Sequence, residues 1–71
     1  MNLEDKITSF KDILVSEEDA ITRKIANNPD DGYFVAWLLL ERAAGFFNDE
    51  GFIPIEVVNA INDCIDKAKK Q

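Results

Sequence analysis

The sequence of 71 residues contains no histidine, one cysteine and three glycines, which lie apart at positions 32, 45 and 51. A zinc site needs about four Cys and His ligands, so this chain cannot supply one. A phosphate-binding loop needs several glycines close together, and none is present. Cys64 has no partner for a disulfide and no histidine to activate it, and it falls on an apolar stripe. We therefore expect a structural thiol, no catalytic residue, no metal, no cofactor and no enzymatic activity.

Long apolar runs are also missing. The longest run covers residues 33–40 and is ended by Glu41 and Arg42, whereas a membrane-spanning helix needs about 20 apolar residues. The first ten residues carry the acidic pair Glu4–Asp5, where a secretory signal would be basic. We expect a cytoplasmic protein.

Basic residues are scarce, with 8 Lys and Arg against 14 Asp and Glu and a net charge of −6. This balance argues against binding to nucleic acid, whose phosphates need clustered cations, and against an anionic membrane surface. A protein partner with a basic surface fits the charge, and so does mere solubility. Asp63 and Asp66, on the polar side of the last helix, are the acidic residues that we predict to contact such a partner.

The residues that are present predict a folded, all-α protein. Apolar residues make up 46% of the chain, and they recur at helical spacing with no strand pattern. We predict one domain over residues 1–71, a compact bundle of four short helices at about 3–14, 17–26, 31–48 and 54–70. A chain this short buries a small core, so a second subunit is a natural source of additional stability.

The first half of the chain leaves two arrangements open. Leu3, Ile7, Phe10 and Leu14 form one apolar stripe, and Ile21 and Ile25 stay in phase with it, so a single helix over 3–26 is possible. Ser16 followed by three acidic residues instead resembles a helix N-cap with acids in the first turn. We favour a break near Ser16.

The other boundaries are clearer. The segment from Asn27 to Gly32 contains Pro29 and should end the second helix, after which Asp30 or Asp31 can cap the third. Gly51 should adopt the left-handed conformation after the third helix, and Pro54 suits the first turn of the fourth.

The third helix is apolar over most of its circumference, which is typical of a central helix. Its broadest apolar face is predicted to contain Tyr33, Ala36, Trp37, Leu40, Ala43, Ala44 and Phe47. We therefore expect Trp37 in the core.

Four apolar residues either complete this small core or exceed what it needs, and we favour the second interpretation. Phe34 and Leu38 fall on the far strip of the third helix, beside Glu41 and Arg42, and Phe52 and Ile53 lie between helices. These six residues form the predicted partner-binding surface, together with the two acids of the last helix. The function expected is a small acidic protein–protein interaction module of inhibitor, immunity or adaptor type. The alternative is a structural bundle that buries its apolar surplus in a homodimer.

Overall fold

The computed structural model describes residues 2–70, and for Pro29 only the backbone. In this part of the chain four α-helices are present: α1 (Leu3–Ser16), α2 (Glu18–Asn27), α3 (Gly32–Phe46) and α4 (Ile55–Lys69). Two short 3-10 turns, η1 (Pro29–Asp31) and η2 (Asn48–Glu50), flank α3. The described residues include no strand, so the all-α bundle is confirmed. None of the described helices has the length and apolar character needed to cross a membrane.

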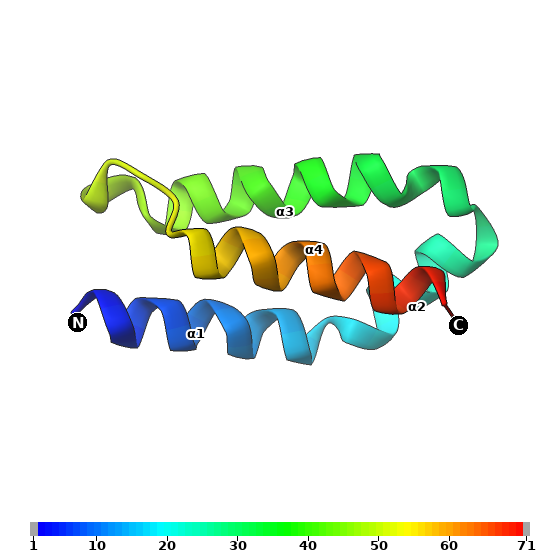
Figure 1. Cartoon of the computed structure of the whole chain (residues 1–71), viewed down its shortest axis with the longest axis horizontal. Coiled ribbons are helices and arrows are strands. Elements are labelled where there is room, and N and C mark those ends of the chain that lie inside the picture. The colour runs from blue at the N-terminus through cyan, green and yellow to red at the C-terminus, as the bar shows by residue number, and fades with distance from the viewer. Residues whose placement is uncertain (1, 71) are drawn as a thin grey trace.

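The fourth helix lies at the centre of the bundle. It packs against α1, α2 and α3, whereas α3 packs mainly against α4 and, near its start, against α2. Figure 1 shows α3 on one side of α4 and α1 on the other. The predicted central position of the third helix is therefore not the observed one, and α3 keeps one long side without a neighbouring helix.

The core is built from the stripes that α1, α2 and α4 present to one another. The predicted residues Ile7, Phe10 and Leu14 of α1 and Ile21 and Ile25 of α2 are all buried. α4 contributes an apolar stripe in which Val57, Ile61, Ile65 and Ala68 are buried and Val58 and Cys64 are half-buried.

Three phenylalanines, Phe10, Phe46 and Phe47, pack together at the end of the core that is nearest to the N-terminus. The Phe10 ring lies edge-on to the Phe46 ring, with the ring centroids 5.6 Å apart. The centroids of the Phe10 and Phe47 rings are 6.1 Å apart. Phe46 and Phe47 are themselves 5.2 Å apart. Edge-to-face pairs of this kind add to the free energy gained by burying the rings, so this cluster fixes the end of α3 against α1.

The break near Ser16 is confirmed, but its cause differs from the prediction. Ser16 is the last residue of α1, and its hydroxyl donates a hydrogen bond to the Ile13 carbonyl oxygen at 2.7 Å. Glu17 is the single linking residue and makes no side-chain cap. Its carboxylate instead binds the Arg42 guanidinium of α3 at 2.6 Å. A side-chain cap does occur at the start of α1, where Asn2 accepts a hydrogen bond from the Asp5 amide at 2.8 Å.

The connections on either side of α3 follow the predicted turn residues with shifted roles. Asp31 occupies the N-cap position of α3 without a side-chain hydrogen bond. Gly51 is left-handed, with φ of 78°, but it ends η2 because α3 has already stopped at Phe46. Pro54 precedes α4, where its carbonyl oxygen accepts hydrogen bonds from the Val57 and Val58 amides.

Candidate functional site

The side of α3 that faces away from α4 carries the largest apolar residues of that helix. Relative exposure is 85% for Tyr33, 51% for Phe34, 56% for Trp37 and 40% for Leu38. Positions 33 and 37, and 34 and 38, are four residues apart, so these side chains are neighbours on the helix surface. We call these four residues the outer face. The predicted exposure of Phe34 and Leu38 is confirmed, whereas the predicted burial of Trp37 is wrong.

The error lies in the rotation of α3 about its axis. Two stripes at helical spacing run along this helix, and both are apolar. The structure buries Val35 and Leu39, together with Ala43 and Phe47 at the edge of the predicted face. Tyr33, Trp37 and Ala44 of the predicted face are exposed. Because α4 is its main neighbour, α3 buries only the arc that faces the bundle. When a helix is apolar over most of its circumference, its sequence does not indicate which side will be buried.

Lysines from two other helices border the outer face at its N-terminal end. The Lys24 ammonium of α2 lies 5.5 Å from the centre of the Phe34 ring. The Lys69 ammonium of α4 lies 5.5 Å from the centre of the Tyr33 ring. Both distances fall in the range of cation–π attraction. These lysines are distant from α3 in sequence, and only the packing of α2 and α4 beside α3 brings them to this surface.

Glu41 and Arg42 follow the outer face along α3 and differ in what they contact. Arg42 is paired with Glu17 at the α1–α2 junction. Glu41 is exposed, and no ion pair within residues 2–70 involves it. Of these two predicted contact residues, Glu41 is thus the one whose charge remains available to a partner.

The two acids predicted on α4 are neighbours one turn apart on that helix, but they line different depressions. Asp66 lines a shallow depression of about 330 Å³ together with Tyr33 and Lys69, and so adjoins the outer face. Asp63 lines a different groove, between α4 and α1. The structure therefore does not gather the predicted contact residues into one site.

The two predicted residues of the η2–α4 connection also differ from each other. Phe52 is exposed, whereas Ile53 is half-buried against the core. Ile53 therefore completes the core more than it offers a contact surface.

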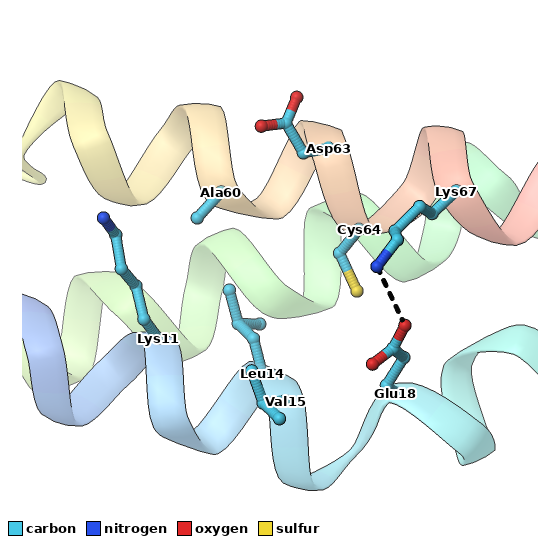
Figure 2. Close-up of a pocket in the computed structure, with 8 residues that line it drawn as sticks. All are labelled: Lys11, Leu14, Val15, Glu18, Ala60, Asp63, Cys64 and Lys67. Atoms are coloured by element: carbon cyan, nitrogen blue, oxygen red, sulfur yellow. Dashed lines mark hydrogen bonds and ion pairs between the residues drawn. The ribbon is translucent and has the colours of Figure 1, made fainter.

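The groove between α1 and α4 has a volume of about 260 Å³ and is open to solvent. Figure 2 shows Lys11, Leu14 and Val15 on the α1 side and Ala60, Asp63 and Cys64 on the α4 side. The ion pair between Lys67 and Glu18, at 3.4 Å, crosses one end of it. Its volume is below the roughly 300–1,000 Å³ of a small-molecule pocket.

The Cys64 thiol at this groove is poorly suited to nucleophilic chemistry. Burial, and secondarily the Glu18 carboxylate, raise the pKa of Cys64 above its ordinary value, while Lys67 lowers it by less. A thiol is a weak nucleophile until it is deprotonated. In residues 2–70 no group of three or more Cys, Asp or Glu side chains is placed to hold a metal ion.

The chain matches no protein-family model, no curated protein and no solved structure. The site is therefore interpreted from its own geometry, in which the outer face of α3 is the most distinctive surface.

Proposed function

We propose that this protein is a non-enzymatic protein–protein interaction module whose binding surface is the outer face of α3. The observation that carries the proposal is the exposure of Tyr33, Phe34, Trp37 and Leu38 on one side of one helix. Contiguous exposed apolar surface of this kind is unusual on a monomer and marks interaction sites.

The composition of the face supports the same function. Trp and Tyr are the residues most enriched among those that dominate binding energy, and they lose little conformational freedom when they are covered. Here they are fixed by a helix of 15 residues, whose opposite side is anchored by Val35, Leu39 and Ala43 in the core. A rigid helix face needs no folding step before it binds, which lowers the entropic cost of association.

The remaining surface supports a binding role over a catalytic one. None of the buried side chains among the described residues is polar or charged, and burial raises the pKa of Cys64, which favours the unreactive thiol. General acid–base catalysis needs a group whose pKa is tuned toward neutrality.

The proposal is tested by site-specific photocross-linking. A photoreactive amino acid replaces Tyr33 in one variant and Asp12 in a control variant, and each is irradiated in an extract of cells that make the protein. Asp12 is also exposed, but it lies on α1, on the other side of α4. We expect protein adducts from position 33 that are absent from position 12, since only the first lies on the outer face.

A second substitution links the adducts to the face itself. Adding Phe34→Ser with Leu38→Ser should abolish adducts from position 33 while circular dichroism stays helical, because both side chains are already at least 40% exposed. Adducts of equal yield from positions 33 and 12, or adducts that survive this double change, would refute the outer face as the binding surface.

A further inference from the structure

We propose that the partner covering the outer face is a second copy of this chain, with the two α3 helices packed antiparallel about a twofold axis between Trp37 and Glu41. This inference rests on the proposed function, since it names the protein that the outer face binds. It is drawn from three properties of α3: the distribution of side-chain size, the distribution of charge and the area available.

The apolar side chains on the exposed side of α3 are large in its first half and small in its second. Tyr33, Phe34 and Trp37 occupy the first half, and the exposed Ala44 and Gly45 the second. In an antiparallel pair centred on position 39, position 33 lies opposite position 45 of the second copy, and 34 opposite 44. Tyr33 and Phe34 then each meet a small residue, and Trp37 meets Glu41, so that the two surfaces complement each other as the interface of a twofold dimer requires.

Gly45 offers the space that this arrangement needs. A Cβ placed on Gly45 would meet nothing within 4 Å, so the surface above it is open. The bundle itself gives no reason for glycine in the last turns of a helix, where it costs about 1 kcal/mol relative to alanine. Close approach of the Tyr33 ring from a second copy accounts for it.

Charge along the same face is also self-complementary. The lysine ammonium groups lie at the Tyr33–Phe34 end, each 5.5 Å from a ring centre, and the unpaired carboxylate of Glu41 lies beyond Trp37. The antiparallel arrangement places Glu41 of one copy opposite Trp37 of the second copy. Trp37 lies one helical turn from the rings of Tyr33 and Phe34, which are bordered by Lys69 and Lys24 of that same second copy. Charges of opposite sign therefore lie near each other twice, once on each side of the axis.

The available area predicts a reversible dimer. Aromatic side chains bury about 150–250 Å² each, so four large residues that are about half exposed contribute roughly 400 Å² per copy. This is about half of the roughly 800 Å² per partner in a standard interface. We therefore expect a weak dimer that dissociates on dilution.

A wholly basic partner suits these features less well. Two of the charges that adjoin the rings are lysines, and they would repel a basic surface. The salt dependence separates the cases: two copies with a net charge of −6 each repel overall, so added salt should leave dimer affinity unchanged or increase it. Affinity for a basic partner would instead fall.

The decisive experiment is a charge swap between two variants, followed by sedimentation equilibrium. The first variant carries Glu41→Lys, and the second carries Lys24→Glu with Lys69→Glu; all three residues are exposed. In a dimer of either variant alone, groups of the same charge lie across the axis from each other. We therefore expect dimer affinity to fall roughly tenfold. Mixed in equal amounts, the two should form a heterodimer with the wild-type dissociation constant, because both contacts again join opposite charges.

The control for net charge is built into the first variant. Glu41→Lys lowers the net negative charge and would strengthen association if overall repulsion were in control, whereas the antiparallel pair predicts weaker association. Circular dichroism of each variant confirms folding. A wild-type chain that stays monomeric up to millimolar concentration, or variants that self-associate like wild type and gain nothing on mixing, would overturn the inference. Cross-links from Tyr33 to other proteins would then leave the proposed function standing.

A second pair of variants tests the packing without changing charge. Gly45→Gln should stabilise the monomer, because it replaces glycine within a helix into open space, yet it should prevent dimerisation by filling the position that Tyr33 of the second copy needs. Gly45→Ala should stabilise the monomer and weaken the dimer by less. Unchanged dimerisation of Gly45→Gln would exclude the proposed alignment of the two helices.

Discussion

Replacing Phe10 with alanine tests the packing of the bundle most severely. Phe10 has no exposed surface and contacts both Phe46 and Phe47. A buried phenylalanine that is truncated to alanine costs about 3–5 kcal/mol, from lost transfer free energy and from the cavity that remains. The free energy of unfolding of a protein of this size is only about 4–10 kcal/mol in total. The substitution should therefore lower the Tm by roughly 15–30 °C, if the chain still folds.

Trp37→Ala is the matched control and removes a larger side chain. Since Trp37 is 56% exposed, folding of the monomer removes less than half of it from water. Its loss should cost about 1 kcal/mol, compared with about 1.5–3 kcal/mol for a fully buried large apolar side chain. The expected fall in Tm is then roughly 4–8 °C.

Both variants are melted by circular dichroism at a protein concentration well below that of dimerisation, because association raises the apparent Tm. We expect a large fall in Tm for Phe10→Ala and a small fall in Tm for Trp37→Ala. Equal losses, or a larger loss for Trp37→Ala, would mean that α3 is rotated from the position described and that the outer face does not exist as such.

Further predictions concern four single positions. Gly51→Ala should destabilise by about 1–2 kcal/mol because φ at this residue is 78°, whereas Gly45→Ala should stabilise by about 0.5–1 kcal/mol; chemical denaturation measures both. Asn2→Ala should cost about 0.5–2 kcal/mol in the same assay, by removing the cap on the Asp5 amide. Cys64 should react with iodoacetamide more slowly in the folded protein than in urea. Since burial raises the pKa of Cys64 above its ordinary value of 9.0, the unfolded chain loses this proton first, so the stability of wild type relative to Cys64→Ala should fall as the pH rises past that value.

Much of the fold was predictable because three of the four helices have one apolar stripe and one polar side. Ile7, Phe10 and Leu14, and likewise Val57, Ile61 and Ile65, admit a single inward orientation, and all six are buried. The break at Pro29 was also accessible, and the break at Ser16 was favoured over a single helix, since turn and capping residues act locally. Which residue caps or ends each helix was less predictable. Ser16 was expected to cap α2, but it is the last residue of α1.

The orientation of α3 could not be obtained from the same patterns. Its two stripes are equally regular, and the choice between them depends on how many helices surround it. That number is a property of the whole bundle, in which α4 takes the central position. The exposure of Phe34 and Leu38 was predicted because they lie outside both broad apolar arcs, whereas Tyr33 and Trp37 were assigned to the wrong one. Lys24 and Lys69 are distant from α3 in sequence, so their contacts with its rings appear only in the folded chain.

Fluorescence of Trp37 tests the central claim most directly, because it is the only tryptophan of the chain and lies on the outer face. Emission and acrylamide quenching are measured on the folded protein as its concentration rises from below to above the dissociation constant. The account predicts a solvent-exposed, readily quenched tryptophan in the dilute monomer, with a shift to shorter wavelength and protection from acrylamide as the sedimenting mass doubles. A tryptophan that is already protected in the dilute monomer, or one that stays exposed while the mass doubles, would contradict the outer face of α3 as the interaction surface.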